Sequence, residues 1–553
     1  MTGHKPCGHF RGAAFSAFFA LLFAAACGGG GNNATPPAAA PAPPPPSGNS
    51  GPTWTAGVYQ DAGLFKDRCE TVRTGLDFEG NPFPDRAGST LEENFWLRSW
   101  TDETYLWNNE VQDRNPANYS DPVAYFDLLR TTATTASGKD KDDFHFSQPT
   151  DEFLRERNSA PVAEYGARLI AYSVSPPRDF RVLYTEAGTP ASDTVMGTPN
   201  LIRGARILEV DGVDLVNANT TAAIDTLNDG LFPLTAGELH TFVVQDPGAA
   251  TTRTIMMISE DLSTPAVNRT AIINTPAGDV GYALVNTFSP FASEQDIADA
   301  ITDMNAAGVT DLVLDLRYNG GGLLAISAQL GYMVAGPSRT SGKAFERLRF
   351  NADAGGINPV TGETNNTTPF FSTGVGFSVP SGDPLPNLNL NRVYILSTDW
   401  TCSASEAVIN GLRGVDVEVV LIGRATCGKP YGFYPEDNCG ETYYTIQFQG
   451  VNQKGFGDYA DGFIPMNSSA PFGVKLPGCL VDDDLDHELG DESEAMLAAA
   501  LQYREFGTCP APPPVSVAAK ALTKADASER PGLDLKRGMR VMENNRDMRM
   551  PEE

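Results

Sequence analysis

The stretch at 393–412 reads VYILSTDWTCSASEAVINGL, and it predicts a strand, a short turn and a helix in succession. The apolar run at 393–396 is typical of a buried strand, and the run at 404–412 has the pattern of a helix. Ser403 falls at the turn between them. There its hydroxyl is held outside both elements, beside the free N–H groups and the positive dipole end of the helix. This position makes Ser403 a candidate nucleophile.

A base for Ser403 is available 26 residues later, at Lys429. A serine hydroxyl is a weak nucleophile without a base, and a lysine can serve as one when desolvation favours its neutral form. Lys429 follows Gly428 shortly after a second buried-type strand at 417–422. The two residues together predict a hydrolase of the serine/lysine type.

Both residues also have plainer interpretations. Ser403 could be only a helix N-cap, with Glu406 completing a capping box. Lys429 could be a solvated surface charge. Ser405 is a second candidate for the nucleophile, although its place fits packing in the first turn of the helix. The choice therefore depends on the rest of the chain.

The chain alternates strand and helix from Val280 onward, which favours a parallel α/β arrangement. A buried-type strand at 312–316 runs into the turn RYNGGG at 317–322. Glycines allow a backbone N–H to face a substrate with no Cβ in the way. The turn is therefore a candidate part of the same site, although three glycines could also form a simple tight turn.

Residues 163–262 read as short strands separated by turns. The candidate strands are 168–172, 180–184, 205–210, 240–244 and 254–257. The piece at 204–212 resembles the strand and tight turn of PDZ domains, and a helix-like stretch at 222–227 lies where their groove helix belongs. PDZ domains add a peptide strand beside this groove and capture its C-terminal carboxylate. Tyr165, Gly166 and Ala167 are the candidate carboxylate-binding loop.

Residues 1–26 have the form of a secretory signal, with a basic start and an apolar run too short to span a membrane. The small residues before Cys27 resemble a bacterial lipobox. We therefore expect Cys27 to be lipidated, with plain secretion as the alternative. Residues 27–56 read as a flexible Pro/Gly/Ala linker.

The regions that flank the central part are less distinctive. Residues 57–162 predict a helical N-terminal domain. Residues 510–553, rich in Pro, Ala and mixed charge, predict a disordered tail. A self-docking segment and a partner-binding arm are the alternatives for this tail.

Composition limits the partners and the compartment. The 553 residues are 41% hydrophobic, enough for two to four domains, and the net charge of −29 argues against a nucleic-acid partner. Outside the signal, six cysteines remain, an even number that fits disulfides in an oxidising compartment. Cys427 and Cys439 bracket a turn and are the expected local pair. No cysteine or histidine spacing suggests zinc, so we expect neither metal nor cofactor.

Three ordered motifs resemble those of the C-terminal processing (tail-specific) peptidases. They are DLRYNGGG at 315–322, SASE at 403–406 and the segment from Gly423 to Lys429. The motif DFHFS at 143–147 is also similar to a short motif that precedes the PDZ domain in that family. The resemblance covers roughly 279–463 well and the earlier regions loosely.

The resemblance implies that Ser403 is the nucleophile and Lys429 the general base. It also implies an oxyanion hole formed by the backbone N–H groups of Gly321 and Ala404. Several relatives carry a glutamine four residues after the lysine, whereas this chain has Phe433.

Two glutamines are candidate replacements for the missing one. Gln447 and Gln449 lie on a following predicted strand. Either amide could orient the lysine if the strand passes close to it.

The expected fold is multidomain α+β, with the helical N-terminal region, a PDZ-like domain at 163–262 and an α/β peptidase domain at 263–509. The resemblance implies a crotonase/ClpP-like catalytic domain. It also implies a serine endopeptidase that cleaves extended or unfolded polypeptides recognised through their C-terminal ends. The expected location is the bacterial envelope, lipid-anchored and facing the periplasm; the oligomeric state stays open.

Three alternatives accompany this interpretation. The chain could be an inactive adaptor that binds peptides through the PDZ-like domain. A Ser-His-Asp triad would have to use His145, because His240 lies in a PDZ-like strand and His487 in an acidic stretch. The acidic run at 482–486 suggests calcium, but it lacks the glycine and glutamate of an EF-hand loop, so we expect a solvated surface.

Overall fold

The structure is a computed structural model that describes residues 51–511 and a short strand at 546–547. The predicted signal, the lipidation candidate Cys27, most of the linker and the rest of the tail lie outside the described residues. Within the described part, no helix combines the length and apolar character needed to cross a membrane.

The centre of the fold is a six-stranded sheet in the order β14-β15-β16-β20-β21-β28. β14 runs antiparallel to β15, and the other neighbours are parallel. The strands are β14 (Val267–Ile273), β15 (Val280–Val285), β16 (Asp311–Asp315), β20 (Arg392–Ser397), β21 (Glu418–Gly423) and β28 (Gly478–Leu480). The α/β alternation predicted from Val280 onward is confirmed.

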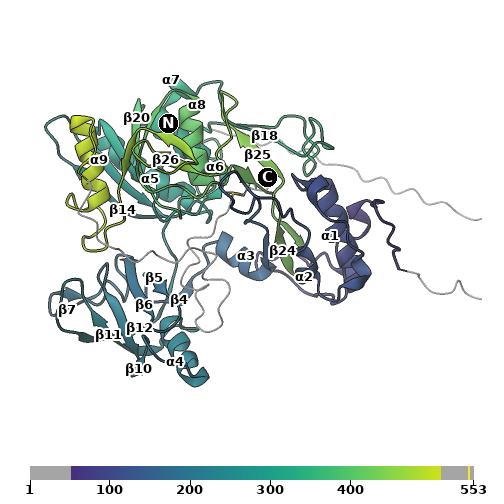
Figure 1. Ribbon diagram of the computed structural model, residues 1–553, viewed down its shortest axis with the longest axis horizontal. Coiled ribbons are helices and arrows are strands. Elements are labelled where there is room, and N and C mark those ends of the chain that lie inside the picture. The colour runs from purple at the N-terminus through teal and green to yellow at the C-terminus, as the bar shows by residue number, and fades with distance from the viewer. Residues whose placement is uncertain (1–50, 512–545, 548–553) are drawn as a thin grey trace, which may run out of the picture. The chain divides into compact units, whose positions relative to one another are not determined.

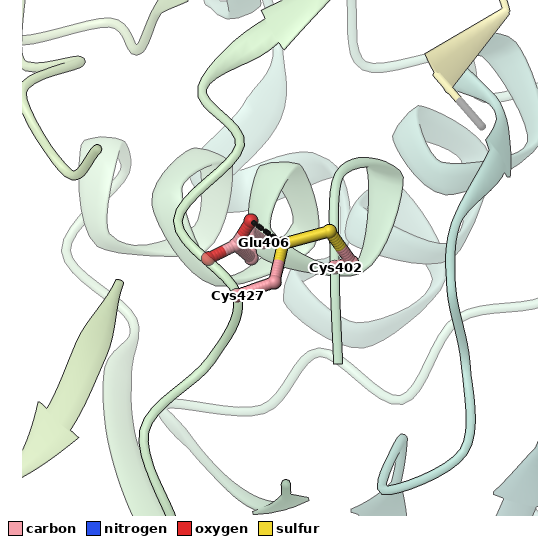
Figure 2. Close-up of side chains that lie close together, drawn as sticks. All are labelled: Cys402, Glu406 and Cys427. Carbon is pink, nitrogen blue, oxygen red and sulfur yellow. Dashed lines mark hydrogen bonds between the residues drawn. A yellow bond between two sulfur atoms is a disulfide. The ribbon is translucent and has the colours of Figure 1, made fainter. Parts of the chain in front are cut away.

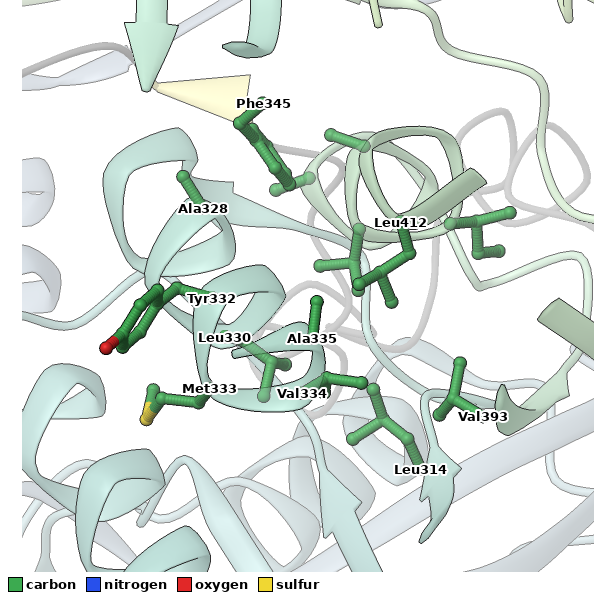
Figure 3. Close-up of a cluster of buried hydrophobic side chains, with 14 of the residues drawn as sticks. Leu314, Ala328, Leu330, Tyr332, Met333, Val334, Ala335, Phe345, Val393 and Leu412 are labelled. Carbon is green, nitrogen blue, oxygen red and sulfur yellow. The ribbon is translucent and has the colours of Figure 1, made fainter. Parts of the chain in front are cut away.

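Both faces of this sheet are buried, which explains the continuous apolar runs in its sequence. Leu312 and Leu314 point into one core, with α5 (Ser293–Ala307), α6 (Leu324–Ala335) and α8 (Ala404–Gly414). Figure 3 shows Leu314 and Val393 facing side chains of α6 and Leu412. Val313 points into the second core, which contains side chains of α9 (Ala495–Phe506), the helix packed on the opposite face (Figure 1).

Smaller sheets surround this layer. A four-stranded sheet has the order β19-β18-β25-β22. The remaining elements of this region are β17 (Gly322–Leu323), α7 (Pro337–Thr340), β18 (Ala344–Arg349), β19 (Thr367–Pro369), β22 (Tyr431–Gly432), β23 (Glu436–Asn438), β24 (Glu441–Tyr444), β25 (Phe448–Val451), β26 (Phe463–Pro465), β27 (Val474–Leu476) and β29 (Arg546–Asp547).

Residues 163–262 form a separate antiparallel sheet in the order β12-β11-β9-β6-β5, with β10 paired to β9. All five predicted strands and the helix are present. They are β5 (Ala167–Ser173), β6 (Asp179–Thr185), β9 (Arg206–Val210), β10 (Val213–Asp214), α4 (Thr221–Leu231), β11 (Leu239–Gln245) and β12 (Arg253–Ile258), with the short β7 (Thr194–Val195), β8 (Thr198–Pro199) and β13 (Glu260–Leu262). This sheet has its own core, and β5 is at its end.

The N-terminal region joins the rest of the fold through a shared sheet, β23-β24-β3. Its longest helix packs Phe95, Trp96 and Trp100 into an aromatic cluster. The elements are η1 (Ala62–Leu64), β1 (Arg68–Cys69), β2 (Arg86–Ala87), α1 (Thr90–Thr104), η2 (Asn108–Glu110), η3 (Pro116–Asn118), α2 (Pro122–Phe126), β3 (Phe146–Pro149), α3 (Thr150–Arg157) and β4 (Val162–Glu164).

The six cysteines outside the signal form three disulfides, as the even count suggested. The pairs are Cys69–Cys439, Cys402–Cys427 and Cys479–Cys509. The predicted Cys427–Cys439 pair is therefore wrong. Closeness along the chain was misleading, because Cys439 is next to the strand that pairs with the N-terminal region, whereas Cys427 lies beside α8.

Candidate active site

The predicted site lies at the carboxyl ends of three neighbouring parallel strands of the central sheet. The glycine turn follows β16, Ser403 follows β20 and Lys429 follows β21. Backbone hydrogen bonds join the loops: Cys402 N–H donates to the Asn319 carbonyl, and Cys427 N–H donates to the Thr401 carbonyl, each at 3.1 Å. The carboxyl ends of parallel strands are where α/β sheets place their sites.

Ser403 has two features that are rare together. Its backbone has φ 59° and ψ −111°, a conformation that costs energy for a residue with a Cβ. Its side chain is fully buried, yet among the described residues Oγ has no hydrogen-bond partner. Buried hydroxyls are nearly always bonded. A strained backbone that holds an unpartnered hydroxyl is therefore a feature of a reactive site.

The predicted capping box of Ser403 and Glu406 is present at the start of α8, but only one of its two contacts is a hydrogen bond. The Glu406 carboxylate accepts the backbone N–H of Ser403 at 3.0 Å, but Ser403 Oγ makes no bond in return. Ser405, the alternative nucleophile, donates its hydroxyl to the Asn319 carbonyl at 3.1 Å. Ser405 thus holds the glycine turn in place. Of the two serines, Ser403 is the one whose hydroxyl makes no hydrogen bond.

Glu406 connects the serine segment to the lysine segment. One carboxylate oxygen accepts the N–H of Lys429 at 2.8 Å, and the other accepts the N–H of Gly428 at 2.9 Å and the hydroxyl of Thr426 at 2.5 Å. The side chain is fully buried, and this burial raises its pKa even though the hydrogen bonds act to lower it. The sequence pattern suggested only a cap at this residue.

Lys429 is fully buried, so the surface interpretation of this residue is excluded. Its amine lies 4.8 Å from the ring centre of Phe144 and 4.5 Å from that of Phe433. Aromatic faces attract an ammonium group, most strongly where water is excluded. Phe433 therefore contacts the amine from the position where several relatives carry glutamine. Phe144 reaches it from the motif at 143–147.

The two replacement glutamines are held in other contacts. Gln447 accepts the Tyr434 N–H at 2.6 Å and lies 3.5 Å from the Thr104 hydroxyl. Gln449 donates to the carbonyl of Gly457 at 3.0 Å. Both glutamine side chains are therefore held by contacts with other parts of the fold.

The glycine turn requires glycine at the position next to Gly321. Gly322 has φ 132°, and a Cβ there would lie 2.3 Å from backbone atoms of Phe288 and Ser289. The N–H of Gly321 donates to Asn319 Oδ1 at 2.9 Å within the turn. Ala404 is buried as the first residue of α8. The oxyanion roles of Gly321 and Ala404 stay predictions.

A disulfide lies directly against the site. Figure 2 shows Cys402 joined to Cys427, with Glu406 beside them. A sulfur of this bond lies 3.3 Å from the Glu406 carboxylate. The three side chains are close enough to suggest a metal centre, but sulfurs in a disulfide are not the thiolates that bind metals. This grouping is a covalent link between the serine and lysine loops.

The histidines of the described residues are held away from Ser403 Oγ. His145 contacts the carbonyl of Phe126 at 2.9 Å and the hydroxyl of Thr445 at 3.2 Å, and burial lowers its pKa. His240 pairs with Asp211, and His487 pairs with Asp484. A Ser-His-Asp arrangement is therefore not formed.

A buried ionic network connects the glycine turn to the sheet at 163–262. Arg203 donates to the Tyr318 hydroxyl at 2.8 Å and pairs with Asp483 at 2.7 Å. Arg317 also pairs with Asp483, at 2.7 Å. The prediction that the acidic run at 482–486 is a solvated surface is wrong for Asp483, whose side chain is only 21% exposed.

The candidate carboxylate loop lies at the start of β5. The hydroxyl of Tyr165 donates to the carbonyl of Gly230 near the end of α4, at 3.0 Å. Gly166 has φ 74°, and a Cβ there would clash with Thr189. Ala167 pairs with Thr185 as the first residue of β5. The role of this loop in binding a carboxylate stays a prediction.

Comparison with known proteins agrees with this geometry. Residues 279–432 match Peptidase family S41, and residues 92–147 match the Peptidase S41 N-terminal domain. A C-terminal processing peptidase from the chloroplast of Tetradesmus obliquus is 26% identical over 363 residues, 62% of this chain and 66% of that protein. The chain thus spans just under two thirds of this relative.

One of the matched solved structures shows the same fold. A crystal structure described as an S41 protease of Bacteroides fragilis superposes with a TM-score of 0.56 at 23% identity, over 75% of this chain and 97% of that chain. The photosystem II D1 C-terminal processing protease gives a TM-score of 0.39 at 18% identity, over 71% of this chain and 94% of that chain.

Proposed function

We propose that this chain, in which residues 279–432 match Peptidase family S41 and residues 92–147 its N-terminal domain, is a serine endopeptidase with Ser403 as the nucleophile and Lys429 as the general base. The observation that carries the assignment is the unpartnered, buried Oγ of Ser403 on a strained backbone. Glu406 fixes the backbone of both residues by hydrogen bonds.

In the first step, Ser403 Oγ attacks a peptide carbonyl carbon while Lys429 Nζ takes the hydroxyl proton. This step needs a neutral amine, and exclusion from water favours that form. Collapse of the tetrahedral intermediate breaks the C–N bond, and Lys429 returns the proton to the leaving amine. Water then attacks the acyl carbonyl while Lys429 accepts a proton from it, and as the ester bond to Ser403 breaks, Lys429 passes that proton to Ser403 Oγ, which releases the acid product and restores the enzyme.

The developing oxyanion needs two preorganised donors. The N–H groups of Ala404 and Gly321 are the proposed pair. The Gly321 N–H bonds to Asn319 Oδ1 in the turn, so it must exchange that partner for the oxyanion. Asn319 is itself anchored by a hydrogen bond to the Val285 carbonyl at 3.0 Å.

We propose that the substrates are extended or unfolded polypeptides, engaged through their C-terminal ends. Support comes from β5, an end strand of its sheet, which can accept an added strand in the manner of a PDZ domain. Tyr165, Gly166 and Ala167 are the proposed carboxylate loop. The contact of Arg203 with Tyr318 gives this domain a direct connection to the glycine turn.

The location proposed for the protein is the bacterial envelope, with a lipid at Cys27. Three disulfides within the described residues fit an oxidising compartment. Mass spectrometry of the mature N-terminus tests this part, because a diacylated cysteine differs in mass from a free one.

The proposed activity is tested with a dye-labelled unfolded protein and the chain from residue 51 onward. We expect turnover by the parent and its loss in Ser403→Ala and Lys429→Ala. Matched controls are the exposed Ser469→Ala and Lys454→Ala, which should match the parent. Turnover that survives Ser403→Ala would refute the assignment of the nucleophile. Peptide binding without any turnover in the parent would favour the adaptor alternative.

A further inference from the structure

The last strand among the described residues lies at the predicted catalytic turn. β29 (Arg546–Asp547) pairs in parallel with β17 (Gly322–Leu323), with Arg546 opposite Gly322 and Asp547 opposite Leu323. Gly322 directly follows Gly321, the proposed oxyanion donor. A segment more than two hundred residues away in the sequence therefore reaches the edge of the catalytic turn.

β17 has only one edge to offer such a strand. Its other edge is bridged to Phe288, whose carbonyl accepts the Leu323 N–H at 3.0 Å. A strand pairs through two edges. β29 thus takes the remaining edge, which is the one a bound polypeptide would need.

The position of β29 relative to the lysine loop supports the same conclusion. β29 also lies next to β22 (Tyr431–Gly432), which begins two residues after Lys429. β29 therefore contacts both the segment that follows the glycine turn and the segment that follows Lys429. Ser403, positioned between these segments in the proposed mechanism, has no exposed surface in this arrangement.

Peptidase substrates commonly bind as an added strand, held by main-chain hydrogen bonds that tolerate many sequences. Such a site accepts a strand of the same chain as readily as a foreign one. Tethering also gives a segment an effective concentration on the order of millimolar. A cis segment at this edge is therefore a strong competitor even when its intrinsic affinity is weak.

We infer that the C-terminal segment containing β29 occupies the substrate strand position in cis and competes with polypeptide substrates. The inference rests on the proposed peptidase function, because it takes β17 as part of the substrate channel. The competition raises KM and leaves kcat unchanged, since a substrate that displaces the tail meets an intact site.

Kinetics on four proteins test this inference. They are residues 51–553, the same chain ended at residue 511, the double variant Arg546→Pro/Asp547→Pro and the control Ala518→Pro/Ala519→Pro. Proline removes the N–H that a strand pair needs, and the control places the same change elsewhere in the tail. We expect KM to fall several-fold in the shortened chain and in the first double variant, with the control equal to the parent.

A binding experiment measures the docking of the C-terminal segment independently of catalysis. A labelled peptide of residues 540–553 is titrated by fluorescence anisotropy against Ser403→Ala chains ended at 511 or at 553. We expect saturable binding to the shortened chain, weaker binding to the complete one, and loss of binding by the peptide with both prolines. Absence of binding up to millimolar peptide would overturn the inference.

The outcomes separate this inference from the proposed activity. No turnover by any of the four proteins, with peptide binding retained, would refute the peptidase and leave the docking intact. Turnover with equal KM in all four would refute the docking alone. Removal of the tail by the active parent, seen in its intact mass but not in Ser403→Ala, would make the segment a substrate and overturn its role as a lasting competitor.

Discussion

The carboxylate of Glu406 accepts the backbone N–H of Lys429 at 2.8 Å. The same side chain accepts the N–H of Ser403 at 3.0 Å, so one buried acid sets the distance between the serine turn and the lysine loop. A charged acceptor makes stronger hydrogen bonds than a neutral one. Glu406 is thus the positioning residue of the site.

Glu406→Gln should lower kcat about 10- to 100-fold and reduce the melting temperature. The amide keeps one acceptor but places an NH2 group against backbone donors, which leaves buried N–H groups unsatisfied at about 1–3 kcal/mol. Steady-state kinetics and thermal unfolding measure the two effects. A substitution at the exposed Glu363 (Glu363→Gln) is the matched control. Unchanged kcat in Glu406→Gln would show that the loops hold their positions without this acid.

Phe433→Leu should move the pH–rate profile of kcat/KM to lower pH. The ring of Phe433 lies 4.5 Å from the Lys429 amine and stabilises its protonated form. Leucine keeps the apolar bulk but removes the π face, so the amine releases its proton more readily. A cation–π contact of about 0.5–2 kcal/mol corresponds to a shift of roughly 0.4–1.5 pH units.

The control for this shift is Phe371→Leu, since Phe371 packs against the core of the central sheet rather than on the amine. Its pH profile should match that of the parent. A profile of Phe433→Leu that moves to higher pH, or does not move, would show that the ring does not act on the base.

The sequence predicted best the strands and helices that are determined by residues close together in the chain. The strands at 312–316 and 393–396 and the helix after Ser403 are continuous apolar or periodic runs, and the structure contains all three. The order of these strands in the sheet then brings Ser403 and Lys429 to the same edge without further information.

Features formed by distant segments were missed. Cys439 pairs with Cys69 because β24 joins β3, and nothing near Cys439 in the sequence indicates this. Phe144 contacts the Lys429 amine for the same reason. The sequence pattern at Glu406 indicated a helix cap and gave no sign of its hydrogen bonds to the lysine loop. An apolar or acidic run does not reveal which partner a fold will bring to it.

Replacement of both cysteines in Cys402→Ala/Cys427→Ala should lower stability and activity together. The bond joins Cys402, next to the proposed nucleophile, to Cys427, near the proposed base, and closing a loop of this length contributes about 3 kcal/mol. We expect a lower melting temperature and a kcat that falls while KM changes little, because substrate contacts are preserved. The pair Cys479→Ala/Cys509→Ala is the control, since it should affect stability but not kcat.

The Asp483 carboxylate should make the protein unfold more readily in acid. Burial alone would raise the pKa of Asp483, but the neighbouring Arg203 and Arg317 and the Tyr318 hydroxyl outweigh it and lower the pKa to about 2. A lowered pKa in the folded state adds stability above the ordinary carboxyl pKa of about 4, and this stability is lost as the pH falls towards 2. The melting temperature should therefore decline between about pH 4 and pH 2.

Asp483→Asn separates this carboxylate from the other acids of the chain. The variant should be less stable at pH 7, by about 3–5 kcal/mol, because the buried Arg203 and Arg317 lose a charged partner. Its melting temperature should then decline less between pH 4 and pH 2 than that of the parent. The exposed Asp482→Asn is the matched control and should keep the acid dependence of the parent. An equally steep decline in Asp483→Asn would assign the acid sensitivity to other carboxylates.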